Sequence, residues 1–167
     1  MSRAFVKEDS AAPEEPLKRQ ASGRPNYVTF AGLELLKARV AELTTLRAGL
    51  LVKKNDGEPR ALQLQQAEID LEYYEGQVKS AKLVDNRGLA LEDVRFGAAV
   101  KVKDQAGAEK EYLIVGEDQA DAEAGKLNWA SPLAAALLGK KPGSRVLLER
   151  KGGNIDLEIF AVRYPQE

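Results

Sequence analysis

The sequence predicts an α+β fold: an antiparallel two-helix coiled coil, followed by an antiparallel sheet with one short helix. Two observations carry this prediction. Up to about residue 84, apolar residues recur at alternating intervals of three and four, which is the spacing of a buried seam on a helix. Beyond residue 85 the chain changes to short runs of alternating apolar and polar residues, separated by glycine-containing turns, which is typical of strands.

The first helix is expected to begin after Thr29, whose hydroxyl can accept hydrogen bonds from the free N–H groups of the first turn. Its seam continues to either Leu46 or Leu50, and the spacing alone does not distinguish them. Gly49 weakens the helix interior by roughly 1 kcal/mol. The earlier residues of this seam are Leu33, Leu36, Val40 and Leu43.

A turn is predicted at Asn55–Pro59, because Asn and Asp bond to their own backbone, Gly accepts a positive φ and Pro suits the first turn of a helix. A second helix of similar length follows, and the two apolar faces can cover each other as a hairpin. Its seam residues are Leu64, Ala67, Leu71, Tyr74, Val78 and Ala81.

The remaining chain predicts a sheet of about 80 residues with one helix packed on it. Ser131 is the expected cap of that helix, Pro132 its first residue and Gly139 its end. The expected organisation is a disordered tail over residues 1–25, the hairpin over 26–85 and the sheet domain over 86–167. The predicted strands are 99–103, 111–115, 127–129, 145–148 and 155–162.

The tail is rich in proline and mixed charge, and such a segment cannot bury enough surface to offset its ordering entropy. Phe5 and Val6 form its one apolar spot, which is either part of a disordered end or a docking element.

Composition excludes several classes of site. The chain has no His and no Cys, which excludes a zinc site built on these residues, a disulfide, a cysteine nucleophile and a Ser-His-Asp triad. The net charge of −1 lacks the basic surplus of a sequence-independent nucleic-acid binder. No apolar stretch is long enough for a membrane span, and the charged N-terminus does not suit a signal peptide. A monomeric cytoplasmic protein without a small-molecule substrate is expected.

Three segments resemble the GreA/GreB family of bacterial transcript cleavage factors. The first is Asn26–Thr29 together with Gly32–Leu36, and the second is Tyr112–Asp121. The third is Ser131–Lys140, with the glycines at 143, 152 and 153 after it. The resemblance covers residues 26–165 and has the same layout of hairpin followed by α+β domain.

The resemblance implies an FKBP-like sheet domain that binds bacterial RNA polymerase and a hairpin that enters the secondary channel of the polymerase. The chain would not be an enzyme and would carry no cofactor of its own, because the polymerase cleaves its backtracked RNA with its own Mg²⁺. Nascent RNA near the hairpin tip would be a further contact. Candidate polymerase-binding residues are Ser131, Pro132, Leu133, Trp129, Glu117 and Asp118.

The tip departs from the family pattern. Asp56 and Glu58 are the candidate acids for the Mg²⁺ of the polymerase, since Mg²⁺ prefers oxygen ligands. Their ordinary interpretation is turn chemistry for Asp56 and a helix-dipole partner for Glu58. The acidic tip motif of the family is absent, and each arm lacks about 7 residues, one heptad, which shortens the reach by about 10 Å. The basic residues near the tip have two possible interpretations, contact with RNA or the channel wall and a solvated turn. These residues are Lys53, Lys54 and Arg60.

Two functional readings of the resemblance therefore remain. The chain either stimulates cleavage of backtracked RNA, or occupies the channel without catalysis and competes with cleavage-competent Gre factors. A third class, a peptidyl-prolyl isomerase, is weakened by the scarcity of aromatic residues for an apolar cup. Those of the sheet domain are Phe96, Tyr112, Trp129, Phe160 and Tyr164.

Overall fold

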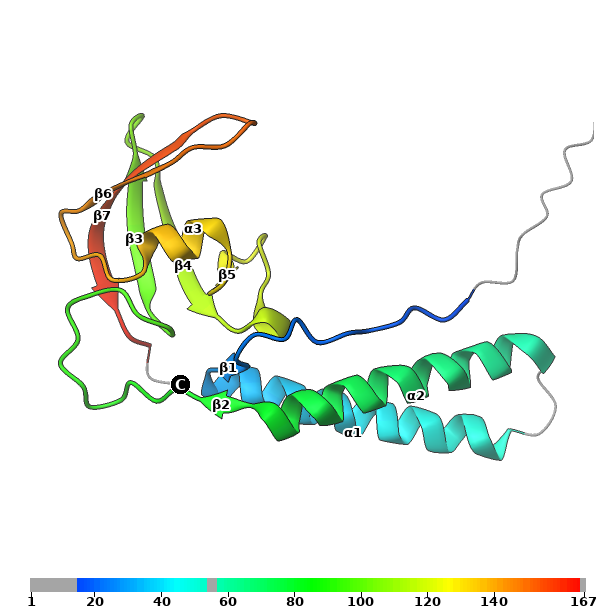
Figure 1. The fold of residues 1–167 in the computed structure, drawn as a ribbon. Helices are drawn as coiled ribbons and strands as arrows, with labels where there is room; N and C mark the ends of the chain where they lie inside the picture. The colour runs from blue at the N-terminus through cyan, green and yellow to red at the C-terminus, as the bar shows by residue number, and fades with distance from the viewer. Residues whose placement is uncertain (1–14, 54–56, 166–167) are drawn as a thin grey trace, which may run out of the picture.

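A helical hairpin projects from one end of a curled sheet (Figure 1). The computed structural model describes residues 15–53 and 57–165. Helix α1 spans Phe30–Val52 and helix α2 spans Gly57–Ser80. The Thr29 hydroxyl accepts a hydrogen bond from the Gly32 amide at 3.0 Å, which confirms the predicted N-cap. Within the described residues, no helix is both long and apolar enough to span a membrane.

The seam between the helices follows the heptad repeat. Leu36, Leu43 and Leu50 are buried at every seventh position of α1, and Ala67 is buried opposite them on α2. Leu46 is 50% exposed, so the open choice between Leu46 and Leu50 is decided in favour of Leu50. The hairpin is thus stabilised by burial of one apolar stripe from each helix.

Two helix-interior glycines offer a test of this description. A Cβ added at Gly49 or Gly76 would meet nothing within 4 Å, and neither residue has a positive φ. Glycine in a helix costs roughly 0.5–1 kcal/mol relative to alanine. Gly49→Ala and Gly76→Ala are therefore each expected to raise the free energy of unfolding by about that amount. Urea denaturation followed by circular dichroism measures it, and a loss of stability would reveal a contact that this structure lacks.

The hairpin is closed at its base by two short strands that the sequence does not predict. Strand β1 (Tyr27–Val28) comes just before α1 in the sequence and β2 (Lys82–Leu83) just after α2, and the two strands pair in parallel. The second helix accordingly ends at Ser80, before the predicted last seam residue, Ala81. Backbone hydrogen bonds from Lys82 to Asn26 and from Val84 to Val28 extend this closure.

The sheet has five strands in the order β5-β4-β3-β7-β6. Strand β5 pairs in parallel with β4, so the sheet is mixed and the prediction of a wholly antiparallel sheet is wrong at this edge. The other neighbours pair antiparallel. The bounds are β3 Ala99–Asp104, β4 Glu109–Val115, β5 Lys126–Asn128, β6 Arg145–Leu148 and β7 Ile155–Arg163.

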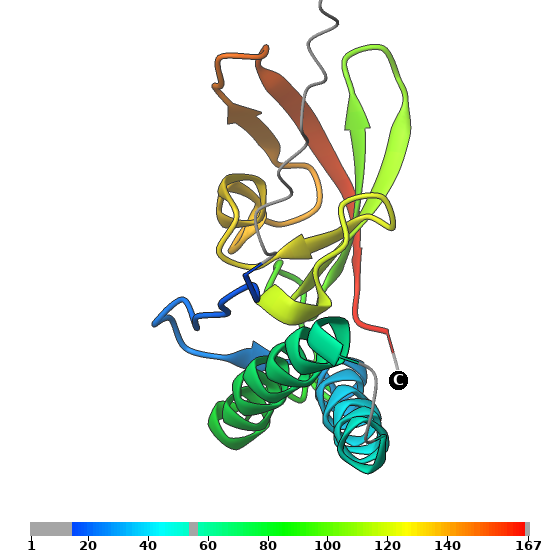
Figure 2. The same cartoon turned by 90° about the vertical axis from the view of Figure 1, so that its right-hand side faces the viewer.

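Helix α3 (Pro132–Leu137) packs on one face of the curled sheet (Figure 2). Ala134 and Leu137 of this helix meet Val100, Ile114 and Ile159 in the core, and all five side chains are fully buried. A short 3₁₀ turn, η1 (Glu117–Gln119), follows β4 and faces the hairpin, which it contacts through side chains. We call β3–β7 with α3 and η1 the sheet domain.

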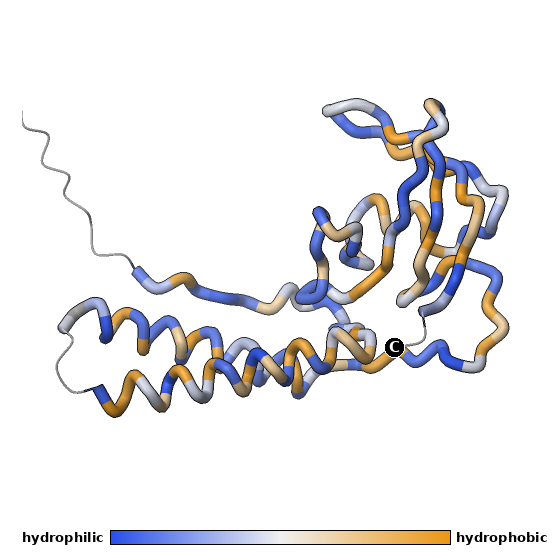
Figure 3. Tube along the Cα trace, turned by 180° about the vertical axis from the view of Figure 1, so that it is seen from behind, coloured by the Kyte–Doolittle hydropathy of each residue, from blue (hydrophilic) through white to orange (hydrophobic). Residues whose placement is uncertain are grey.

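The described part of the N-terminal segment runs extended beside α2. Residues 1–14 of the expected tail lie outside the described residues, as does the Phe5–Val6 spot. Residues 15–25, the N-terminal arm, are mostly hydrophilic (Figure 3). The arm has no helix or strand of its own and reaches from β1 to the middle of α2.

Candidate functional site

Ser131 and Pro132 begin α3 at the surface of the sheet domain. The Ser131 hydroxyl accepts a hydrogen bond from the Ala134 amide at 3.2 Å, so the predicted cap is confirmed. Pro132 is exposed, whereas Leu133 is half-buried and packs against the sheet core. The cap therefore fixes which residues of this short helix face solvent.

An open hollow of about 420 Å³ lies between α3 and β6, which is one of the two edge strands of the sheet. Leu147 on its wall is 60% exposed, and the cationic side chains of Lys140 and Arg145 stand beside it. An open surface of this kind, with apolar residues flanked by charges, fits another protein better than an enclosed small molecule. It is lined by Ala135, Ala136, Leu138, Lys140, Arg145, Val146 and Leu147.

Trp129 lies at the junction between the sheet domain and the hairpin. It follows β5, is half-buried against the core, and its ring stands edge-on to Tyr27 of β1 with centroids 5.2 Å apart. Tyr27 also packs on Phe96, at 6.0 Å. Among the described residues, the indole nitrogen of Trp129 is the buried side-chain polar atom that lacks a hydrogen-bond partner. Trp129 therefore joins two parts of the fold by apolar packing.

The aromatic residues of the sheet domain do not gather around one cup. Trp129 and Phe96 are occupied by Tyr27, while the Tyr164 hydroxyl donates to the Asp93 carbonyl. Phe160 is 40% exposed on the opposite face of β7 from the buried Ile159. This dispersal does not favour the isomerase reading, which needs an enclosed aromatic site.

The carboxylates of η1 have partners within the chain. Glu117 accepts a hydrogen bond from the Ser22 hydroxyl at 3.0 Å and lies 3.6 Å from the Arg24 guanidinium. Asp118 accepts from the Tyr73 hydroxyl at 2.9 Å and from the Gln77 amide at 2.6 Å. Burial, together with the Asp118 carboxylate, raises the pKa of Tyr73 well above its usual value. These two candidate binding residues thus connect the sheet domain to the hairpin and the arm.

A buried hydrogen bond completes the junction and was not expected from the sequence. The Thr29 hydroxyl, besides capping α1, donates to Gln119 Oε1 at 2.7 Å. A Cβ at Gly32 would lie 2.7 Å from the same Gln119 oxygen, so a larger residue there would require the Gln119 side chain to move away from Thr29. Thr29 and Gly32 belong to the first family-like segment, and their spacing was the signal available in the sequence.

The predicted tip acids are not brought to a site by the described part of the structure. Asp56 and Lys54 lie outside the described residues, and for Glu58 only its place in the first turn of α2 is described. Arg60 has a structural role, because its Nε donates to the Leu50 carbonyl at 2.7 Å. That carbonyl belongs to the last turn of α1, where backbone acceptors lack helical partners. Lys53 is exposed at the end of the same helix.

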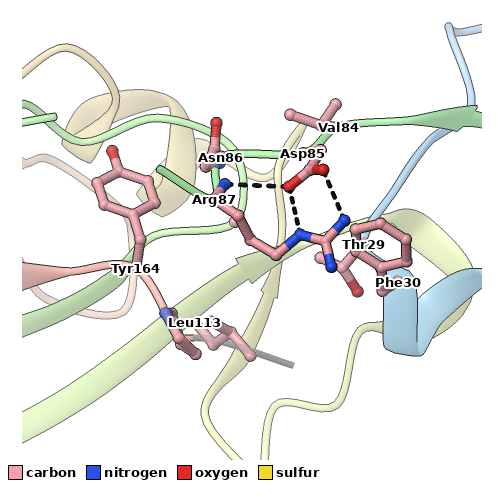
Figure 4. Close-up of a pocket in the computed structure, with 10 residues that line it drawn as sticks. Thr29, Phe30, Val84, Asp85, Asn86, Arg87, Leu113 and Tyr164 are labelled. Carbon is pink, nitrogen blue, oxygen red and sulfur yellow. Dashed lines mark hydrogen bonds and ion pairs between the residues drawn. The ribbon is translucent and has the colours of Figure 1, made fainter. Parts of the chain in front are cut away.

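A small cavity of about 40 Å³ marks the joint where the chain passes from the hairpin to the sheet domain (Figure 4). Arg87 dominates it, holding both carboxylate oxygens of Asp85 at 2.8 Å and lying 4.1 Å from the centroid of the Phe30 ring. The Arg87 side chain and amide lower the pKa of Asp85 to about 2. The cavity has room for water but not for an organic ligand.

This ion pair predicts a dependence of stability on pH. Because the folded pKa of Asp85 lies below its unfolded value of about 4, the pair stabilises the fold above that value and loses its effect as the pH falls to about 2. The Asp85→Asn variant is therefore expected to show a shallower acid-induced loss of stability between those values. Thermal unfolding at stepped pH measures this, with Glu123→Gln, an exposed carboxylate, as the control. Identical acid profiles for all three proteins would contradict it.

Comparison with known proteins relates the chain that has this arrangement to one protein family. The family model described as "Transcription elongation factor, GreA/GreB, C-term" matches residues 90–164. The transcription elongation factor GreA of Thioalkalivibrio sulfidiphilus is 34% identical over 152 residues, which take in 82% of this chain and 96% of the relative. The chain belongs to the GreA/GreB family.

Other GreA/GreB relatives match in part or at lower identity. GreA of Nitratidesulfovibrio vulgaris is 35% identical over 98 residues, and this match spans 58% of the chain and 60% of the relative's length. The solved structure of "Prokaryotic transcription elongation factor GreA/GreB" from Nitrosomonas europaea is 18% identical and covers 83% of this chain and 99% of its own, with a TM-score of 0.41.

Proposed function

We propose that this chain binds bacterial RNA polymerase through the sheet domain and directs its hairpin into the secondary channel. The membership in the GreA/GreB family carries the proposal, since the match with the Thioalkalivibrio GreA extends over 96% of that relative. The exposed surface that begins at Ser131 and Pro132, with the hollow beside α3, supports a docking role. The chain acts on the active site of the polymerase and supplies no cofactor of its own.

Docking is expected to depend on the Ser131 cap. The double change Ser131→Ala and Pro132→Ala removes the side-chain acceptor for the Ala134 amide and the fixed φ of the first helical residue. Loss of a cap costs about 1 kcal/mol, and the exposed face of α3 should shift with it. Polymerase capture by the immobilised variant should fall, as measured by surface plasmon resonance.

The matched control is Ser144→Ala with Pro142→Ala, which lies in the connection between α3 and β6. Capture by this control should remain close to that of the unaltered chain. Equal capture by a hairpin fragment of residues 26–85 and by the whole chain would overturn docking through the sheet domain.

A second function, occupation of the channel without catalysis, is favoured by positions of a GreA relative that have no counterpart in this chain. The match with the Thioalkalivibrio GreA spans 152 positions but takes in 82% of these 167 residues, about 137, so about 15 positions of that relative have no counterpart here. Loss of one heptad from each arm of the hairpin would account for nearly all of them. We propose that the shortened tip, with Asp56 and Glu58, does not reach the Mg²⁺ of the polymerase or the nascent RNA beside it.

A further inference from the structure

The N-terminal arm is attached to the middle of α2 by backbone recognition and by an ion pair. The side-chain amide of Gln66 accepts from the Leu17 amide at 2.6 Å and donates to the Leu17 carbonyl at 3.0 Å. Two residues along the arm, Arg19 Nε donates to Asp70 Oδ1 at 2.7 Å. One α2 face thus holds both the main chain of the arm and its charged side chain.

The Arg19 attachment is specific in geometry. Its guanidinium lies 5.7 Å and 5.4 Å from the ring centroids of Tyr73 and Tyr74, within the range of cation–π contacts. Asp70 is only 8% exposed, and Gln66 also donates to it at 3.1 Å. A carboxylate so shielded on a helix surface needs its cationic partner, because an unpaired buried charge is unfavourable.

The other end of the arm is attached to the sheet domain. Ser22 and Arg24 both reach Glu117 of η1, while Asn26 donates to the Gln77 carbonyl of α2 at 2.9 Å. The same 3₁₀ turn holds α2 directly through Asp118. The arm therefore contacts the hairpin and the sheet domain at once and spans the angle between them (Figure 1).

The hairpin is long and is attached to the sheet domain at one end. The rigidity of this attachment therefore determines how precisely the tip is positioned. With 23 residues in α1, the hairpin is about 35 Å long, and a turn of about 10° at the base moves the tip by about 6 Å. One chain connection, from β2 to β3, and the η1 contacts with α2 already join the two parts. A strap anchored part-way along the hairpin resists such rotation better than contacts at the base alone.

We infer that residues 17–24 form a detachable brace that sets the angle between the hairpin and the sheet domain, anchored at Asp70 and at Glu117. The role of the brace in positioning the hairpin tip rests on the proposed function, whereas the existence of the brace does not depend on it. It is detachable because its contacts are polar and the Leu17 side chain is 77% exposed, so little apolar surface holds it down. Raising the ionic strength should weaken both anchors, since the side chains of Arg19 and Arg24 are 42% and 58% exposed.

The chain has no cysteine, so two labels can be placed without background. Val52→Cys at the end of α1 and Leu147→Cys on β6 are 78% and 60% exposed and lie outside the junction. Pulsed electron paramagnetic resonance between spin labels at these positions reports the distribution of distances from hairpin to sheet domain. When the triple change Arg19→Ala, Ser22→Ala and Arg24→Ala is added to this labelled pair, the width of the distance distribution should at least double.

The control is Lys18→Ala with Gln20→Ala, the two exposed residues of the arm on either side of Arg19, and it should leave the distribution narrow. The charge swap Arg19→Asp with Asp70→Arg should restore more of the narrow distribution than Arg19→Asp alone. Raising the salt concentration from 0.05 to about 0.5 M should broaden the distribution of the otherwise unaltered labelled chain, which requires no variant to fold.

An unchanged distribution in both the triple variant and high salt would overturn the brace. Polymerase capture by the unlabelled chain and its unlabelled arm variants, which keep Leu147 of the proposed docking hollow, tests the proposed function separately. Loss of the narrow distribution with capture intact supports the brace, whatever the hairpin does in the polymerase. A chain that shows the expected broadening but never captures polymerase would overturn the proposed function and leave the brace standing.

Discussion

Replacing Gly116 with alanine is expected to loosen the junction between the hairpin and the sheet domain and to destabilise the fold. Gly116 precedes η1 with an ordinary φ of −71°, so the backbone conformation itself accepts alanine. A Cβ there would overlap the Tyr27 carbonyl oxygen of β1. Because that neighbour is backbone, it cannot rotate away as a flexible side chain would, and overpacking of this kind costs about 1–3 kcal/mol.

The single tryptophan of the chain gives this prediction a local readout. Trp129 lies edge-on to Tyr27, so displacement of β1 should hydrate the indole and shift its emission to longer wavelength in the folded protein. Urea denaturation gives the accompanying loss of stability. Gly152→Ala is the matched control, because a Cβ there meets nothing within 4 Å. Unchanged emission and stability in Gly116→Ala would show that β1 does not sit against this residue.

The helices were predictable because their signals are local. The three-four spacing of apolar residues and the caps at Thr29 and Ser131 act within one or two turns, and the structure confirms them. The choice between Leu46 and Leu50 was not local. It depends on where the second helix lies, and Leu50 is the residue that keeps the heptad interval from Leu43.

The sequence did not predict the elements that are too short to show a periodic pattern of apolar residues. Strands β1 and β2 have two residues each, which is too short for alternation to appear. The three-residue strand β5 was expected, but its direction depends on the path of the chain after η1, and it pairs in parallel with β4. No spacing rule distinguishes these outcomes, because the pairing partners are far apart in the chain.

The junction residues show the same limit. Glu117 and Asp118 look like solvated loop residues beside their neighbours in sequence, yet their partners are Ser22, Tyr73 and Gln77. Each of those partners is 41 to 95 residues away. The family-like motif could mark the segment as special, but a one-dimensional pattern could not show that its acids face inward. The N-terminal arm, classed by composition as disordered, has partners of the same long-range kind in its described part.

Adding this chain to a backtracked polymerase complex is expected to give RNA cleavage at least about 100-fold slower than a full-length GreA gives, because even a 1 Å misplacement of a reacting group can cost that much. A carboxylate must come within about 2.1 Å of Mg²⁺ to bind it. Removing one heptad from each arm withdraws the tip by about 10 Å. The measurement is the rate of release of short RNA from labelled, stalled complexes, with the standard GreA alone as reference.

A competition assay distinguishes a regulator that occupies the channel from a weak cleavage factor. A factor that occupies the channel should slow cleavage by the standard GreA in proportion to its concentration, and Asp56→Ala with Glu58→Ala should change this inhibition little. The variant Ser131→Ala with Pro132→Ala, weakened in docking, should inhibit less. Residual cleavage abolished by the acidic double change would instead identify a weak cleavage factor. Cleavage at the rate of the standard GreA, lost on Asp56→Ala, would overturn the reach argument, because the sheet domain would then have to dock deeper by about the 10 Å that the missing heptads remove.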